Sequence, residues 1–181
     1  MWRRLRWVLL ALVVVVAGLA AAAVLTQKPT LDDDAQAVDA RWTTLRAALV
    51  PRYAALEQAT TVLGANGQGQ RAVTKDLVAD LATWKQATGS GSVAAQTQAA
   101  NRLEGQGARL RANILGSPLL SQNQSVVAAL AAFDGVVPPT AVAQAYDRAV
   151  QTYEDDRTSM LRAPVATVFG FDARPRFDLR T

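Results

Sequence analysis

Two runs of consecutive carboxylates are the first places to look for chemistry in this 181-residue chain: Asp32-Asp33-Asp34 and Glu154-Asp155-Asp156. Paired carboxylates can bind a metal ion or act as general acid and base. Consecutive residues of a helix point about 100° apart, however, so three neighbours cannot converge on one ion. We therefore expect Glu154–Asp156 to form a solvated face beside Arg157 and Arg162. We expect Asp32–Asp34 to begin a helix, with calcium binding as the open alternative, although a calcium loop needs donors at alternating positions.

The composition excludes most other catalytic sites, because the chain has no cysteine and no histidine. Disulfides, thiol nucleophiles, the common zinc sites and Ser-His-Asp triads are therefore impossible. A di-iron bundle needs Glu-x-x-His pairs, so the absence of histidine excludes that class of metal site as well. The glycine-rich stretch 64–69 lacks the Gly-Lys-Ser/Thr of a phosphate-binding loop. We predict no catalytic residues, no cofactor and no metal site, and we predict that the protein is not an enzyme.

Two tyrosines are candidates for lining a ligand cleft. Tyr146 and Tyr153 lie seven residues apart, two turns along one face of a predicted helix. The alternative is that both pack in the core with their hydroxyls at its edge.

The C-terminal tail, residues 163–181, combines aromatic and basic residues. Three of the four phenylalanines of the chain lie in it, and residues 157–181 carry five arginines against two aspartates. This composition suits contact with a membrane partner or with lipid headgroups. The alternative is that the phenylalanines close one end of a helical bundle. The candidate contact residues are Phe169, Phe171, Arg174, Arg176 and Phe177.

The N-terminus has the pattern of a membrane anchor. Residues 7–25 contain no charge and, as a helix, would span about 28 Å, close to the hydrocarbon core of a bilayer. Arg3, Arg4 and Arg6 precede them, which predicts a cytoplasmic N-terminus and an extracytoplasmic body on the plasma membrane, with the lipid bilayer as partner of residues 7–25. A signal peptide cleaved near residues 21–23 is the alternative. Gly18 and Ala22 are two small residues four apart, a spacing that lets membrane helices pair, so a homo-oligomer is a further alternative.

Outside residues 1–6 the charge is nearly balanced, with 16 basic and 15 acidic residues. A nucleic-acid-binding surface requires clustered positive charge, so we predict no nucleic-acid partner.

The chain after the predicted anchor, which we call the body, is predicted to be helical. A heptad seam runs through Val38, Trp42, Leu45, Leu49, Leu56 and Leu63, with Arg52 and Ala59 at the two remaining steps. Pro29 is expected to separate this helix from the anchor, and Pro51 to kink it near residues 47–51.

Further helices are predicted around residues 73–84, 93–114 and 126–133. A last helix has its seam at Val142, Tyr146, Ala149, Tyr153 and Met160. We predict an all-α fold: an antiparallel (up-down) four-helix bundle with an extra short helix, preceded by one transmembrane helix. The predicted order is a basic cytoplasmic N-terminus at 1–6, the transmembrane helix at 7–25, a linker at 26–31, the bundle at 32–162 and the tail at 163–181, packed on or near the bundle.

The two ends of the body resemble the LemA family. The matching runs are Ala145-Tyr146-Asp147-Arg148-Ala149 with Tyr153-Glu154, then Ala163-Pro164, Phe169-Gly170-Phe171 and Arg174-Pro175-Arg176-Phe177-Asp178; near the start they are Val38-Asp39-Ala40-Arg41-Trp42 and Arg52-Tyr53. Glu57-Gln58 stands where the family usually has Pro-Asn, and residues 60–116 match only in helical character, so the chain resembles a divergent member. The resemblance implies a membrane-anchored helical bundle without an established activity, and association with membrane proteins of the TPM-domain type.

The sequence is compatible with two functions. The absence of catalytic groups favours a scaffold or interaction protein at the cell envelope. The alternative is a helical bundle that senses or binds a small molecule or lipid.

Overall fold

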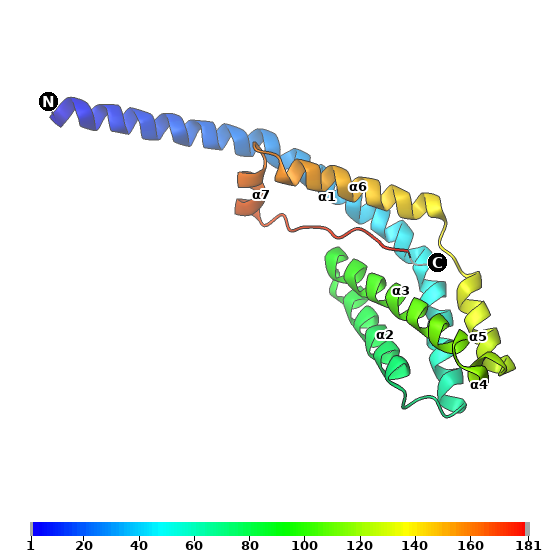
Figure 1. The fold of residues 1–181 in the computed structure, drawn as a ribbon. Coiled ribbons are helices and arrows are strands. Elements are labelled where there is room, and N and C mark those ends of the chain that lie inside the picture. Colours follow the sequence, from blue (N-terminus) through cyan, green and yellow to red (C-terminus); the bar gives the residue numbers. More distant parts are fainter. Residues whose placement is uncertain (1, 180–181) are drawn as a thin grey trace.

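A computed structural model describes residues 2–179, and the side chains of residues 7, 26–89 and 91–179 within them. This part of the chain is helical and contains no strand, which confirms the all-α prediction (Figure 1). The helices are α1 (Trp2–Ala65), α2 (Ala72–Ser90), α3 (Val93–Leu115), α4 (Pro118–Ser121), α5 (Gln124–Gly135), α6 (Thr140–Thr158) and α7 (Ala163–Phe169).

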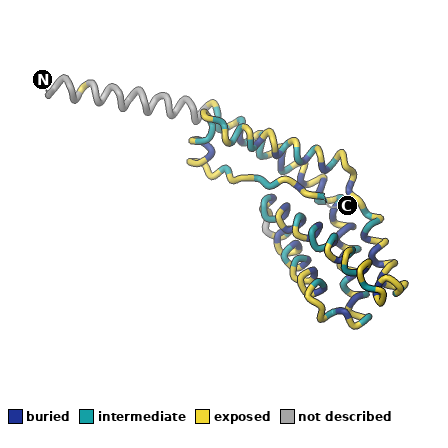
Figure 2. The backbone as a smooth tube through the Cα atoms, viewed as in Figure 1, coloured by how far each residue is buried: buried dark blue, intermediate teal, exposed yellow. Residues whose placement is uncertain are grey.

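Helix α1 is the central helix of the domain. It packs against five others: α2, α3, α5, α6 and α7. Helices α2 and α3 form a hairpin, and α6 and α5 follow one another along α1 (Figure 1). Every step of the predicted seam from Val38 to Leu63 is buried, Arg52 and Ala59 included. The buried positions line the inner side of the helices in Figure 2.

The expected break at Pro29 is wrong, because α1 continues through both Pro29 and Pro51. The predicted linker at residues 26–31 is therefore helical, and Asp32–Asp34 do not begin a helix. A proline inside a helix removes one hydrogen bond and bends the axis, but packing can offset that loss. Here Leu31 is fully buried against α7, which holds this part of α1 in place. Figure 1 shows that α1, the helix that contains Pro51, bends in its cyan part.

An aromatic layer crosses the middle of the core. Trp42 contacts Trp84 and Tyr146, with ring centroids 6.4 and 5.3 Å apart, and Tyr53 lies 5.0 Å from Trp84. The Trp42 indole Nε1 donates to Gln96 Oε1 over 2.8 Å, so its buried N–H is satisfied. This layer joins α1, α2, α3 and α6.

The seam predicted from Val142 to Met160 ends earlier than expected. Helix α6 stops at Thr158, so Met160 lies in the following turn with 92% of its surface exposed. The buried side of the helix is made by Ala143, Tyr146, Val150 and Tyr153.

The predicted basic segment 1–6 and transmembrane segment 7–25 lie outside the described side chains, apart from Trp7. Among the residues that are described, no single helix is long and apolar enough to cross a membrane; α5 and α6 meet that criterion only together, and they are bent by 56°.

Candidate functional site

The C-terminal tail returns along the domain as an extended strap. After Gly170, whose φ of 70° ends α7 in the left-handed region, residues 171–179 have no regular structure. The strap passes α6 and the start of α3 (Figure 1). An extended backbone offers unpaired N–H and C=O groups that need partners when it packs on a protein. Side chains of α6 and α3 supply them.

Both candidate tyrosines donate to the strap. The Tyr153 hydroxyl donates to the Asp172 carbonyl over 2.7 Å, and the Tyr146 hydroxyl donates to the Pro175 carbonyl over 2.9 Å. The spacings match, because seven helical residues and three extended residues both cover about 10 Å. Burial raises the pKa of Tyr146 to about 12, so its hydroxyl stays protonated and acts as a donor. Tyr146 is buried, as the alternative interpretation expected, and from the core its hydroxyl holds the strap.

Side chains of both helices also accept hydrogen bonds from the amides of the strap. Glu154 Oε1 accepts from the Arg174 amide over 2.6 Å, and Asp147 Oδ1 accepts from the Phe177 amide over 2.9 Å. The Asn101 side chain accepts from the Asp178 amide and donates to the Arg176 carbonyl, each over 2.8 Å. Two helices thus recognise the strap through its backbone, as a protein recognises an extended peptide.

The five tail residues predicted to contact a partner separate into two groups. Phe177 is in the core, Phe171 is half-buried, and the Arg174 guanidinium lies 3.3 Å from the Asp39 carboxylate. Phe169 and Arg176 are exposed. Phe169 and Arg176 are thus the two of the five that stay exposed while the strap is bound.

A groove of about 310 Å³ lies where α1, the start of α3, α6 and the strap meet. Tyr153 lines it, but Tyr146 does not, so the structure brings only one of the two predicted tyrosines to a cleft. The walls combine aromatic rings with both signs of charge: Lys28, Asp32, Tyr153, Phe169, Phe171 and Arg174. Such a wall suits a ligand with an apolar body and a polar end.

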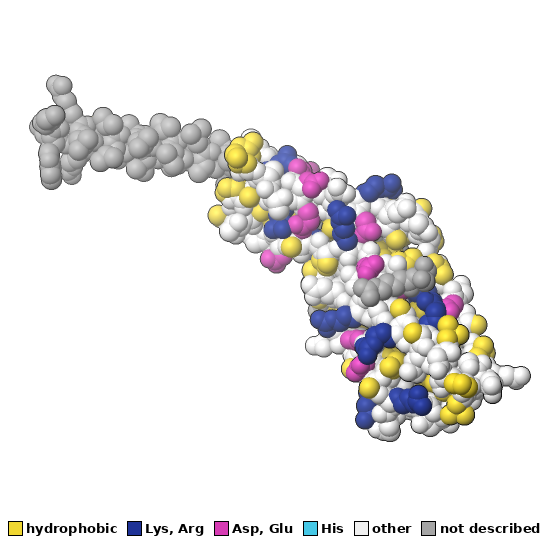
Figure 3. Space-filling view, viewed as in Figure 1, with side chains coloured by type: hydrophobic (Ala, Val, Ile, Leu, Met, Phe, Trp, Pro, Cys, Tyr) yellow, Lys and Arg dark blue, Asp and Glu magenta, His cyan; other side chains and the backbone are white. Residues whose placement is uncertain are grey.

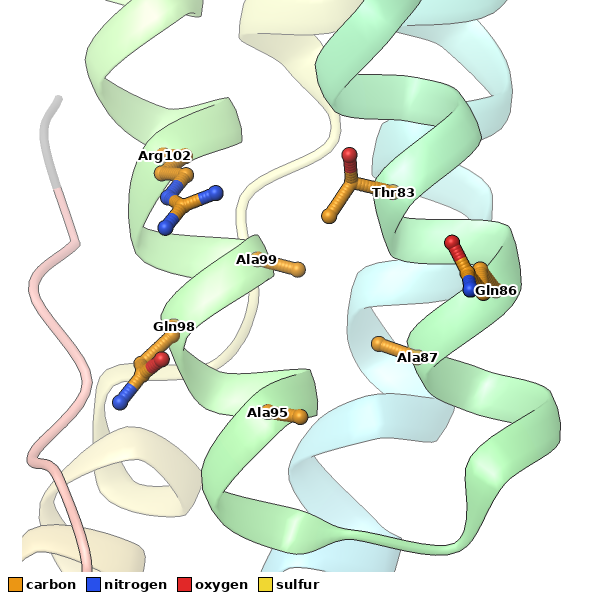
Figure 4. Close-up of a pocket in the computed structure, with 7 residues that line it drawn as sticks. All are labelled: Thr83, Gln86, Ala87, Ala95, Gln98, Ala99 and Arg102. Atoms are coloured by element: carbon orange, nitrogen blue, oxygen red, sulfur yellow. The ribbon is translucent and has the colours of Figure 1, made fainter.

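A second groove, of about 240 Å³, lies between α2 and α3 (Figure 4). Figure 4 shows alanines facing one another across it, with Thr83, Gln86, Gln98 and Arg102 around them. Its walls contain one charged side chain, Arg102, and hold no acid-base pair.

Three residues of the two acidic runs form ion pairs. Glu154 binds Arg157 over 2.6 Å, Asp156 binds Arg162, and Asp32 binds Lys28 over 2.5 Å. Among the described residues, no group of three acidic side chains is placed to hold a metal ion. Burial and the neighbouring Asp156 carboxylate raise the pKa of Asp34.

The most buried polar pair, Arg52 and Glu104, was not predicted from the sequence; the two residues are 1% and 0% exposed. Only one member of the pair stands out in the sequence: Arg52 occupies a step of the otherwise apolar α1 seam. A charged residue at such a position needs a buried partner. Nothing in the sequence singles out Glu104.

Comparison of the chain with models of protein families, with curated proteins and with solved structures finds no match.

Proposed function

We propose that this protein is a single-pass, membrane-anchored scaffold of the cell envelope, with residues 7–25 in the plasma membrane, the N-terminus in the cytoplasm and the helical domain outside. The observation that carries the proposal is the continuity of α1 from Trp2 to Ala65. One helix would join the anchor to the centre of the core, so the domain would be held rigidly to the membrane.

In this proposal the domain is an up-down four-helix bundle of α1, α2, α3 and α6, with α5 as the extra short helix. Val136–Pro139 separate α5 from α6, and both pack on α1. The resemblance of both ends of the body to the LemA family supports the same architecture and suggests a partner of the TPM-domain type.

The end of the domain formed by α3, α4 and α5 is the surface proposed for that partner. It carries the exposed side chains Leu115, Leu119 and Val127. Exposed apolar side chains gathered in one region commonly mark an interaction site.

Photo-crosslinking in native membranes tests the scaffold. A benzophenone amino acid at Leu119 is compared with one at Gln86, an exposed position on α2. We expect one stoichiometric membrane protein at Leu119 and none at Gln86. Capture of nothing from either site would contradict the scaffold, and capture of the same chain would make it a homo-oligomer.

The topology has its own test, because the chain lacks cysteine. A membrane-impermeant maleimide should label Leu119→Cys in intact cells and should not label Arg4→Cys. A mature chain that begins after residue 23 would contradict the anchor and favour a cleaved signal peptide.

The groove at Tyr153 supports a second candidate, a binding site for a lipid or small amphiphile. In a screen of such compounds, ligands should raise the melting temperature of the protein. The gain should disappear in Phe171→Ala, whose ring lines the groove, and survive in Gln98→Ala, which lies in the other groove.

A further inference from the structure

Four exposed hydrophobic side chains, which we call the cap, lie around α7. Met160 and Leu161 belong to the turn before it, and Val168 and Phe169 to its last turn. Their exposed fractions are 92, 74, 77 and 44%. Figure 1 shows α7 lying across the end of the domain from which α1 projects, and Figure 3 shows hydrophobic side chains at that end.

Helix α7 is apolar on both of its sides. Val165 and Ala166 face inward and pack on Leu31 of α1. Val168 and Phe169 remain exposed on the other side. A helix that is hydrophobic all round belongs in an apolar environment on both sides. The domain provides one such environment, and the outer side requires another.

The cap lies level with the end of the apolar stretch 7–25. Arg162 Nε donates to Gln27 Oε1 over 2.8 Å, and Lys28 Nζ lies 5.7 Å from the centre of the Phe169 ring. At 1.5 Å per residue, Gln27 and Lys28 stand only about 3–5 Å beyond Leu25 along the helix. If residues 7–25 span a bilayer, the cap lies at the depth of its headgroups.

The charges around the cap argue against an electrostatic partner. Lys28 is paired with Asp32, and Arg162 with Asp156. An interfacial helix attracted by anionic lipids instead presents unpaired Lys and Arg on its polar side.

We propose that the cap inserts into the outer leaflet of the bilayer that residues 7–25 cross, at the boundary between headgroups and acyl chains. The proposal rests on the proposed membrane anchor and adds a second point of contact with the lipid. Two contacts fix the orientation of the domain: α7 lies in the plane of the membrane, and α1 rises from it. The interaction is apolar, so it does not depend on anionic lipid.

Single cysteines carrying a polarity-sensitive fluorophore test the insertion in the full chain, reconstituted in phosphatidylcholine vesicles. The positions are Leu161, Val168, Val16 in the middle of the apolar stretch, and Leu119 at the other end of the domain. Nitroxide lipids quench the fluorophore, with the nitroxide placed near the headgroup or deep in the acyl chain. We expect headgroup-proximal nitroxides to quench the labels at Leu161→Cys and Val168→Cys, deep nitroxides to quench Val16→Cys, and neither to quench Leu119→Cys.

The controls separate the cap from the anchor. Quenching at Val16→Cys without quenching at Leu161→Cys and Val168→Cys would overturn the cap and leave the anchor in place. No quenching at Val16→Cys would overturn both. A blue-shifted but unquenched label at Leu161→Cys would mean that a second copy covers the cap, which also overturns the proposal.

A charge variant gives an independent readout. In Leu161→Asp/Val168→Asp, a label at Met160→Cys should lose its blue shift and its quenching, while helix content stays unchanged because both positions are exposed. Adding phosphatidylglycerol should leave the quenching of the unaltered cap the same. A label that stays quenched in the charge variant would contradict insertion.

Discussion

The Arg52 guanidinium and the Glu104 carboxylate form a two-pronged ion pair in the centre of the domain, with Nε 2.8 Å from Oε1 and Nη2 2.9 Å from Oε2. The remaining nitrogen, Nη1, donates to the carbonyls of Phe133 and Val136 over 3.1 and 2.8 Å. Arg52 therefore also caps the C-terminus of α5, where carbonyls lack helical partners. The guanidinium stacks 4.0 Å from the centre of the Phe133 ring. One side chain of α1 thus ties α3 to α5.

Removing one member of this pair leaves the other charge buried. We expect Arg52→Met or Glu104→Leu to lower the free energy of unfolding by about 3–5 kcal/mol. The double variant should lose less than either single one, since no unpaired charge remains. The measurement is urea unfolding followed by tryptophan fluorescence. Lys85→Met, which breaks the exposed Lys85–Glu57 pair, is the control and should change stability by less than about 1 kcal/mol. Equal effects of Arg52→Met and Lys85→Met would contradict a buried pair.

Gly107 allows α3 to approach the same cluster. A Cβ at this position would lie 2.6 Å from Cζ and 2.8 Å from Cε1 of the buried Phe133 ring. Gly107→Ala should therefore destabilise by about 1–3 kcal/mol, although alanine is the better helix former. Gly89→Ala in α2 is the control, since its Cβ would meet no atom within 4 Å. Thermal unfolding of the two variants compares them, and a Gly107→Ala protein as stable as Gly89→Ala would show that the approach is looser.

The strap should open when its side-chain partners are removed. Asn101→Ala deletes the hydrogen bonds to the Arg176 carbonyl and the Asp178 amide, each with a net contribution of about 0.5–1.5 kcal/mol. Trypsin should then cleave faster after Arg176, whereas Arg174 is protected by the proline that follows it. Gln98→Ala, an exposed change on the same helix, should cleave at the unaltered rate. If Asn101→Ala also cleaves at that rate, the core contact of Phe177 alone holds the strap.

Much of the fold follows from patterns that the sequence displays. The α1 seam is a heptad repeat, and burial of one face of a helix requires no more than that. The predicted break at Pro29 is wrong because the local effect of a proline is outweighed by a tertiary contact, that of Leu31 with α7. The predicted extension of α6 to Met160 is wrong for the converse reason: the seven-residue spacing continues in the sequence after the helix has ended.

The site was less predictable. Tyr146 and Tyr153 were found from their spacing, but their role as donors to the strap depends on an extended segment without periodicity. Arg52 was visible on the seam, whereas Glu104 and Gly107 lie in a helix whose sequence gives no reason to pair them with α1 or α5. Such contacts depend on how helices far apart in sequence are brought together.

Asp34 supplies a prediction about pH. Its folded-state pKa lies above the ordinary value of 3.8, chiefly through burial and then through Asp156, so the folded protein binds more protons than the unfolded chain between those two pKa values. Stability therefore falls as pH rises through that window, and the loss is complete above the folded pKa. Asp34→Asn should raise the melting temperature at neutral pH, and the gain should vanish below about pH 3.8. Asp155→Asn, on the exposed side of α6, should show no such pH-dependent gain. A lower melting temperature for Asp34→Asn at neutral pH would mean that attraction to Arg162 outweighs burial.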